Sequence, residues 1–376
     1  MNIRKCQQGE MSKIIKVANS AFKDERPKGY NFRNSVPHIY SNKNIDYSSI
    51  HFVAENDKNE FVSIGGNLIQ SIYLKNEEYP FSFIGTIGTV PKYRHQGLMS
   101  SIIKEINTEN INNNIIFSIL SGKRNRYQNF GYEHAGFQCV YVIDKQQSTY
   151  LAKNKDISIK RFKNKDLDEV YSIYEQNQKF TLRTKDNFAI HVNNYKNKLY
   201  TIFDKTTIVG YISINNTTIS EINLINNNYL EAVLSTLLTK NIIKYETNNH
   251  HDQYFFVSIN RLNNQLIQTI DKLADSKQLI EKYSFKIYDL IRFIQLLYNV
   301  NSNTPNNIEE IYKIENKTYK FDIKNKKLKI EETANNPMMK FTNQADFIRF
   351  AMGNTDTNNA SSIFPLFFDI NICDNF

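Results

Sequence analysis

The chain has 376 residues, of which 40% are hydrophobic and 13% aromatic, with 25 Phe and 23 Tyr. This apolar content predicts a folded protein of roughly two or three domains and excludes a chain that is disordered throughout. The net charge is +9, but the lysine residues are scattered and form no consecutive block, so the sequence argues against nucleic acid as a partner and leaves room for a small polyanion.

Residues 1–145 are predicted to form several strands and two helices. Apolar residues between 10 and 22 share one helical face and predict a first helix after a short opening strand. Apolar residues alternate on both sides of the turn 56–59, which predicts an antiparallel hairpin over 51–56 and 60–74. The predicted elements that follow are a strand over 81–90 that Pro91 ends, a helix over 98–109, a strand over 115–120, and a last strand of this part over 141–145.

The next part of the chain looks like a second copy of the first. After a polar stretch at 145–156, a strand and a helix over 157–176 and a hairpin over 199–214 repeat the opening order. The helix start that follows, within 221–238, has no basic residue and no glycine. A polar linker at 301–307 precedes a third part, which comprises a strand meander over 311–332 and a helix over 343–353 that begins near Asn343 or Gln344 and has Gly353 past its end.

A basic, glycine-containing turn joins the strand over 81–90 to the helix after it, in the segment VPKYRHQGLMSSII. Such a turn can bind phosphate, because N–H groups at a helix start point the same way and the helix dipole adds positive potential. Gly97 lets the backbone approach the anion, while Arg94 and His95 supply side-chain donors. Similar residues also occur in turns with a purely structural role, so the segment by itself leaves both interpretations open.

The same segment, Val90 to Ile103, resembles the acetyl-CoA signature of the GNAT acetyltransferases. In that signature Arg or Gln is followed after two residues by Gly and, one residue later, by Gly or Ala. Arg94 and Gly97 match, and Met99 departs from the pattern at the last small position. Leu98 before a bulky residue is the form usual in the Eis-like branch, which joins two GNAT domains to a sterol-carrier-like C-terminal domain.

The resemblance implies an α+β fold with tandem GNAT domains of mixed, mostly antiparallel sheets flanked by helices. We expect a catalytic GNAT domain at 1–150, a degenerate second GNAT domain at 151–298 and a small sterol-carrier-like α+β domain at 299–376. Because the second copy lacks the basic turn, acetyl-CoA is expected in the first domain alone. The resemblance also implies a homo-oligomer, often a hexamer.

Acetyl-CoA is the cosubstrate that the resemblance implies. We expect its pantetheine arm to pair with the backbone of Ile87 and Thr89 as an added strand would, and its pyrophosphate to lie on residues 95–100. The expected cofactor-binding residues are Ile87, Gly88, Thr89, Arg94, His95, Gln96, Gly97, Leu98, Met99, Ser100, Gly122 and Lys123.

A second matching stretch is RYQNFGYEHAGF, residues 126–137. Eis-like enzymes carry a Tyr-x-x-Phe-Gly-Tyr run after the fifth strand, and its first tyrosine, here Tyr127, is the general acid. A phenol suits this role, since its ordinary pKa of about 10 keeps it protonated at neutral pH and able to give a proton to the departing CoA thiolate. Without the resemblance Tyr127 is one of 23 tyrosines, most of which must be packing residues.

The last residues, SIFPLFFDINICDNF, resemble the closing segment of the Eis-like branch. There the C-terminal carboxylate enters the active site as the general base, which implies that role for Phe376. A free α-carboxyl is a weak base, with a pKa of about 3.5, so it needs desolvation or a relaying water. The alternative is a frayed terminus, but four Phe residues make this tail too apolar to leave in water, so we expect it to be docked.

The expected reaction is transfer of the acetyl group to a primary amine by direct attack, without a covalent enzyme intermediate. The acceptor is a small-molecule or peptide amine, such as an aminoglycoside, a polyamine or a lysine side chain. Asp24, Glu25 and Asp374 are the acidic residues that the resemblance offers for binding it. A different class of function stays open: a non-catalytic sensor that binds CoA or a lipid on degenerate GNAT and sterol-carrier-like domains.

Other sites and locations find little support in the sequence. Cys6, Cys139 and Cys373 lie far apart, so neither a disulfide scaffold nor a zinc site nor a cysteine nucleophile is expected. The run His250, His251 and Asp252 suggests a metal, but no fourth ligand has suitable spacing, and we expect a solvated turn. The polar start of the chain and the absence of an apolar run of about 18 residues predict a cytoplasmic protein that does not enter a membrane.

Overall fold

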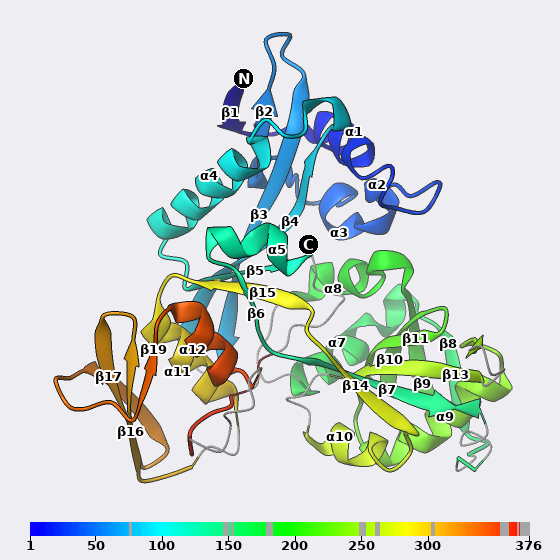
Figure 1. Ribbon diagram of the computed structural model, residues 1–376. Helices are drawn as coiled ribbons and strands as arrows, with labels where there is room; N and C mark the ends of the chain where they lie inside the picture. The colour runs from blue at the N-terminus through cyan, green and yellow to red at the C-terminus, as the bar shows by residue number, and fades with distance from the viewer. Residues whose placement is uncertain are drawn as a thin grey trace. The chain divides into compact units, whose positions relative to one another are not determined.

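The computed structural model describes the chain over residues 1–74, 77–145, 150–151, 154–177, 183–247, 253–259, 264–301, 305–353, 361–366 and 368. By their contacts these residues form two units. Unit 1 comprises residues 1–6, 50–137 and the described part of 281–369, and unit 2 comprises residues 7–49 and the described part of 138–280. Each unit contains its own large mixed sheet (Figure 1).

The main sheet of unit 1 has seven strands in the order β1-β2-β3-β4-β5-β15-β6. The strands β4 and β5 run parallel, whereas β4 pairs antiparallel with β3 and β5 pairs antiparallel with β15. The strands are β1 (Asn2–Lys5), β2 (His51–Glu55), β3 (Phe61–Leu74), β4 (Glu77–Thr89), β5 (Phe117–Ser121), β15 (Tyr283–Ile287) and β6 (Glu133–His134). The predicted β2–β3 hairpin is confirmed.

Different helices cover the two faces of this sheet. The Phe117 ring of β5 packs against Phe293 of α11 (Leu290–Val300), with ring centroids 5.0 Å apart. Leu120, three residues along the same strand, belongs to a buried cluster with Ile102 and Ile106 of α4 (Leu98–Asn112). Since successive strand side chains point to opposite faces, the spacing of three places α11 and α4 on opposite sides.

The helix α4 packs closely on β3. Ile102, Ile103 and Ile106 are completely buried, which stabilises the fold by about 1.5–3 kcal/mol for each side chain relative to exposure. Gly65 of β3 permits this approach, because a Cβ added there would lie 2.7 Å from Cγ2 of Ile102. The helix predicted over 98–109 is therefore confirmed, with three further residues at its end.

A small sheet near the end of unit 1 has the order β18-β17-β16-β19. Its strands are β16 (Ile308–Ile314), β17 (Lys317–Lys324), β18 (Lys327–Glu332) and β19 (Met339–Phe341), and α12 (Gln344–Ala351) follows them. Rings of Tyr312, Phe321, Phe347 and Phe364 pack together in its core. The predicted cap is confirmed, since Oδ1 of Asn343 accepts from the Asp346 N–H at 2.8 Å.

The sheet of unit 2 follows the order β14-β7-β13-β11-β10-β9-β8, with β12 beside β13. Its strands are β7 (Gln138–Asp144), β8 (Ile157–Arg161), β9 (Lys198–Asp204), β10 (Thr207–Asn215), β11 (Thr218–Leu224), β12 (Glu246–Thr247), β13 (Gln253–Ile259) and β14 (Ser276–Ile280). The helices of this unit include α1 (Met11–Ala21), α2 (Phe32–Ser35), α3 (Pro37–Tyr40), α7 (Leu167–Asn177), α8 (Lys185–Val192), α9 (Leu230–Thr239) and α10 (Asn264–Ile270). The predicted hairpin over 199–214 is confirmed as β9–β10.

One strand lies in a different sheet from the one expected. The predicted strand over 141–145 forms, but as β7 it pairs with β13 and β14 of unit 2 and is not the last strand of the first sheet. In unit 1, β5 pairs instead with β15, about 160 residues further along the chain. An alternating pattern predicts a strand but does not specify its partner, and this is the physical reason for the error.

The predicted α+β fold class is confirmed, since mixed sheets are flanked by helices in both units. The duplication, the sterol-carrier-like identity of the last part and the domain bounds 1–150, 151–298 and 299–376 stay predictions. Within the described part of the chain, no helix combines the length and the apolar character needed to cross a membrane.

Candidate functional site

The parallel pair β4–β5 is the first feature of the candidate site. Its register runs from Phe81 opposite Phe117 to Ile84 opposite Leu120. Beyond that point the register between the two strands ends, while β4 continues to Thr89 alongside β3. The carboxyl end of β4 therefore extends past its pairing with β5.

A bulge distorts β4 directly after the last paired residue. Thr86 and Ile87 stand opposite the single residue Gly65 of β3, and Thr86 adopts a φ of +50°. Bulges bend a strand and redirect its main-chain groups, and a positive φ is uncommon for a β-branched residue. Residues 85–89 are half-buried where residues 81–84 are buried, so a ligand can approach the end of this central strand.

The turn after β4 is exposed and strongly curved. Residues 94–97, Arg-His-Gln-Gly, are all exposed, and both His95 and Gly97 have positive φ, at +65° and +74°. Nε of Arg94 donates to the Thr89 carbonyl at 3.3 Å, which holds the turn against the end of the strand. The predicted phosphate turn thus contains two left-handed residues and lies on the surface directly before the helix.

The amino end of α4 is arranged as an anion site. Gly97 is its N-cap residue and provides no side-chain cap, and the first turn contains no acidic residue. A Cβ added at Gly97 would meet nothing within 4 Å, so the left-handed backbone, and not crowding, favours glycine here. The first N–H groups of the helix, on Leu98, Met99 and Ser100, have no acceptor within a helix, and an anion such as a pyrophosphate can accept from them.

Tyr127 lies at the end of α5 (Arg124–Tyr127), directly after β5, and its side chain is buried. The ring packs on Gly122, where an added Cβ would lie 2.7 Å from Cε2 of Tyr127. Gly122 also has a φ of +151°, so both the backbone and the ring exclude a side chain at this position. Lys123, the N-cap residue of α5, is exposed.

The structure brings several of the predicted residues into one cluster. The Tyr127 ring belongs to a buried group with Ile84 of β4 and Leu120 of β5, and Ile87 and Met99 pack against that group. The tyrosine, the end of β4 and the first turn of α4 are therefore neighbours. Met99, the departure from the signature, contributes an apolar contact to this cluster.

A buried polar network lies behind the tyrosine. The Tyr132 hydroxyl donates to Oδ1 of Asn107 at 3.0 Å and lies 2.9 Å from Oγ of Ser118. Tyr288 of unit 1 also donates to Asn107, at 2.7 Å. Burial raises the pKa of Tyr132 well above its ordinary value of 10, so this phenol stays protonated and acts as a fixed donor. No sequence pattern indicated these contacts, because they join α4, β5 and residues 132 and 288, which are far apart in the sequence.

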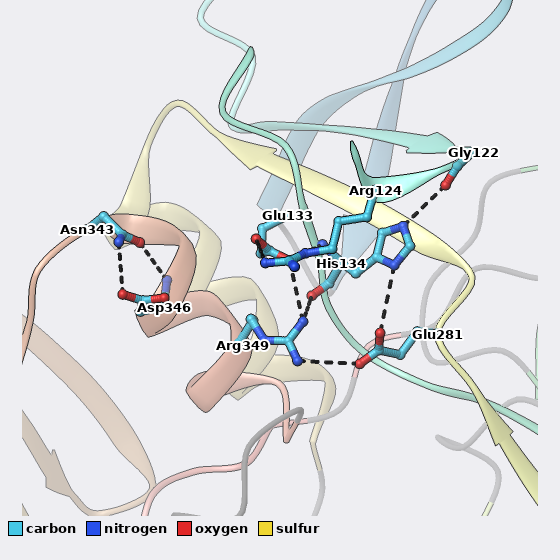
Figure 2. Close-up of polar contacts among 8 residues, drawn as sticks. All are labelled: Gly122, Arg124, Glu133, His134, Glu281, Asn343, Asp346 and Arg349. Atoms are coloured by element: carbon cyan, nitrogen blue, oxygen red, sulfur yellow. Dashed lines mark hydrogen bonds and ion pairs between the residues drawn. The ribbon is translucent and has the colours of Figure 1, made fainter. Parts of the chain in front are cut away.

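A second polar cluster, shown in Figure 2, supports the turn before Tyr127. Arg124 donates from Nε and Nη2 to the two carboxylate oxygens of Glu133, at 2.5 and 2.8 Å. Burial opposes the ionisation of Glu133, but the Arg124 hydrogen bonds and charge outweigh it and hold the pKa of that carboxyl below its usual value. Arg349 of α12 lies 3.4 Å from the same carboxylate.

The predicted acceptor and base residues belong to other parts of the chain than the cluster around Tyr127. Asp24 and Glu25 are exposed residues of unit 2, in the turn after α1. Asp374 and Phe376 lie outside the described residues, as does the run 250–252. Their roles stay predictions.

Known proteins share both the sequence features of this region and the fold. Residues 2–135 match the family model described as an acetyltransferase (GNAT) domain. This part of the chain is similar to a GNAT acetyltransferase domain. This match covers the β4 end, the basic turn, α4 and Tyr127, which are the parts of the candidate site described above.

Solved structures share the fold along almost the whole chain. A GCN5-related N-acetyltransferase from Anabaena variabilis gives a TM-score of 0.69 at 13% identity, and the match covers 100% of both chains. Eis1 from Mycobacterium abscessus gives 0.65 at 12% identity, also over 100% of both. A probable N-acyltransferase of unknown function from Enterococcus faecalis gives 0.66 at 16% identity, over 98% of this chain and 97% of that one. At such identities these likenesses establish the fold alone, and no curated protein matches the chain.

Proposed function

We propose that this protein is an N-acetyltransferase that moves the acetyl group of acetyl-CoA to a primary amine. The observation that carries the proposal is the combination, in one cluster of unit 1, of an uncapped helix start, a half-exposed bulged strand end and a buried tyrosine. The GNAT match over residues 2–135 supports it.

The helix start fits the charged part of the cosubstrate. The N–H groups of Leu98, Met99 and Ser100 and the turn residues 94–97 suit a pyrophosphate, because an anion accepts hydrogen bonds and is stabilised by the helix dipole. The half-exposed backbone at 87–89 suits the amide-bearing pantetheine arm, which can pair with a strand. Gly122 and Lys123 flank the same region of β5.

The transfer itself requires two proton movements. The neutral amine nitrogen attacks the thioester carbonyl carbon, the new C–N bond forms, and the C–S bond breaks to release the CoA thiolate. The amine loses one proton to a base, for which we assign the C-terminal carboxylate of Phe376. The thiolate gains one proton from the hydroxyl of Tyr127, which acts as the general acid.

The acceptor is an amine of small size or a peptide lysine, with Asp24, Glu25 and Asp374 as candidate contacts. Incubation with acetyl-CoA and a panel of aminoglycosides, polyamines and lysine peptides, followed by detection of free thiol, tests the function. We expect amine-dependent thiol release. Tight acetyl-CoA binding without turnover on any amine would instead favour a non-catalytic CoA sensor.

Extension of the chain after Phe376 tests the base. A short C-terminal tag places an amide where the carboxylate was, so we expect kcat to fall while acetyl-CoA still binds. A tag of the same length before Met1 serves as the control. Full activity with the C-terminal tag would remove Phe376 from the reaction.

A further inference from the structure

His134 connects the tyrosine turn to the last helix of unit 1. Its Nε2 lies 3.2 Å from the carbonyl oxygen of Gly122, and its Nδ1 lies 3.7 Å from Oε2 of Glu281 (Figure 2). A carbonyl oxygen can only accept, so Nε2 carries the hydrogen in this contact. The imidazole is mostly buried, with 17% of its side chain exposed.

The orientation of the Gly122 peptide affects the position of the Tyr127 ring. Gly122 is the residue on which the Tyr127 ring packs, and it has no side chain that could fix its peptide in another way. A hydrogen bond to its carbonyl therefore fixes the peptide against which the ring lies. We propose that His134 is a positioning residue that holds Tyr127 through Gly122, an inference that rests on the proposed role of Tyr127 in acetyl transfer.

The surrounding ion pairs hold His134 in turn. Arg349 of α12 donates from Nη1 to the His134 carbonyl at 3.3 Å, and its Nη2 lies 3.7 Å from Oε1 of Glu281. Glu281 thus faces both the His134 ring and Arg349. Next to His134 in β6, Glu133 accepts from Arg124 of α5, the helix that ends at Tyr127. The strand β6 therefore contacts residues 122–124 through two side chains, Glu133 and His134.

This cluster extends beyond the residues that the GNAT model matches. Glu281 and Arg349 lie 146 and 214 residues past the end of that match at residue 135, yet both contact His134. The last part of unit 1 therefore takes part in orienting the tyrosine, and its role is not limited to packing.

A double-mutant cycle tests the inference. We expect His134→Ala to lower kcat about tenfold, because a displaced acid is less well aligned with the thiolate. In a Tyr127→Phe background the same change should have no further effect on kcat, because the group that His134 positions is then absent. His134→Gln, whose amide nitrogen can reach the same carbonyl, should restore most of the activity.

Asn343→Ala is the matched control for the stability of this region. It removes the cap of α12 next to the cluster but none of the His134 contacts, so it should lower the unfolding temperature and leave kcat unchanged. An unchanged kcat in His134→Ala, or an equal loss in the Tyr127→Phe background, would overturn the inference.

A second measurement does not depend on turnover. With 3-fluorotyrosine at position 127, we expect the fluorine NMR signal to shift in His134→Ala, to return in His134→Gln and to stay in place in Asn343→Ala. A fluorine signal that stays at the same position in His134→Ala would overturn the inference by itself. If the protein with the native His134 shows no turnover on any amine but the signal still shifts in His134→Ala, the proposed reaction fails while the positioning of Tyr127 by His134 stands.

Discussion

Two parallel strand pairs, β4–β5 in unit 1 and β11–β13 in unit 2, end in different surroundings. The register of β11 with β13 ends at Ile219, as that of β4 with β5 ends at Ile84. The five residues that follow are half-buried in β4 but buried throughout in β11, at 220–224. The same strand order can thus present an accessible strand end or a core strand.

Buried polar side chains account for part of this difference. Glu221, two residues past the end of the β11 register, forms a two-point ion pair with Arg183 at 2.9 and 2.8 Å, and both side chains are almost completely buried. Thr86 stands at the corresponding place in β4, in the bulge. Glu221 also accepts from Tyr211 at 2.5 Å, so in unit 2 the protein's own side chains surround the strand end.

The first turns of α4 in unit 1 and α9 in unit 2 also differ: that of α4 leaves room for an anion, and that of α9 does not. The Asn226 side chain accepts from the Asn228 N–H just before α9, and Glu231 places a carboxylate in the first turn of that helix. The start of α4 has neither feature. A phosphate is therefore favoured at α4 and disfavoured at α9, because a carboxylate already occupies the positive end of the dipole there.

The largest effect on activity is expected from Tyr127→Phe. Removal of the proposed general acid should lower kcat about 10²–10⁴-fold while acetyl-CoA still binds, as measured by steady-state kinetics and calorimetry. Tyr298→Phe, at another buried tyrosine of unit 1, is the control and should keep kcat. Tyr127 lies six residues after the end of β5, whereas the six residues after β13, 260–265, include no tyrosine. If Tyr127→Phe left kcat unchanged, this tyrosine would not be a functional difference between the two strand pairs.

A large effect on stability is expected from Arg183→Met in unit 2. The change leaves the buried Glu221 carboxylate without its guanidinium partner, which should lower the free energy of unfolding by about 3–5 kcal/mol in urea titrations. The double change Arg183→Met with Glu221→Leu should cost less, because no charge is stranded. A loss below about 1 kcal/mol in the single variant would show that this pair does not hold the strand end.

A smaller effect follows from giving α4 the acidic first turn of α9. Ser100→Asp should raise the Kd for acetyl-CoA about tenfold, because the new carboxylate competes with the pyrophosphate for the helix start. The unfolding temperature should stay the same or rise slightly, since an acidic residue favours the helix dipole. Ser100→Asn is the neutral control, and equal affinities for the two variants would contradict an anion site here.

The smallest effect concerns the more exposed ion pair of unit 1. The folded-state pKa of Glu133 lies below the unfolded one, so its carboxylate stabilises the fold at neutral pH and that contribution is lost as pH falls through the folded-state pKa. Glu133→Gln should therefore reduce the fall in unfolding free energy between pH 7 and pH 3, by on the order of 1 kcal/mol because Arg124 is half-exposed. An unchanged pH dependence would show that this pair contributes nothing.

The sequence predicted those helices and strands whose apolar residues have clear periods. The α4 residues Leu98, Ile102 and Ile106 are an example, and all three are buried. It did not predict the sheet that β7 joins, since pairing of Tyr254 with Asp144 depends on contacts between distant parts of the chain.

The candidate site was predicted unevenly. The turn 94–97 and Tyr127 lie in local motifs and could be found, whereas the bulge at Thr86 depends on the register with β3. The support from Arg349 joins residues 215 and 216 positions apart, and no local pattern reports such a contact. Local motifs in the sequence thus indicated candidate residues, but not the distant groups that contact them.

The number of acetyl-CoA molecules bound per chain tests the contrast between the two strand pairs most directly. Isothermal titration calorimetry on the full chain should give one site, and Ser100→Asp should weaken that site. Two sites per chain, or one site that Ser100→Asp leaves unchanged, would contradict binding at β4 and α4.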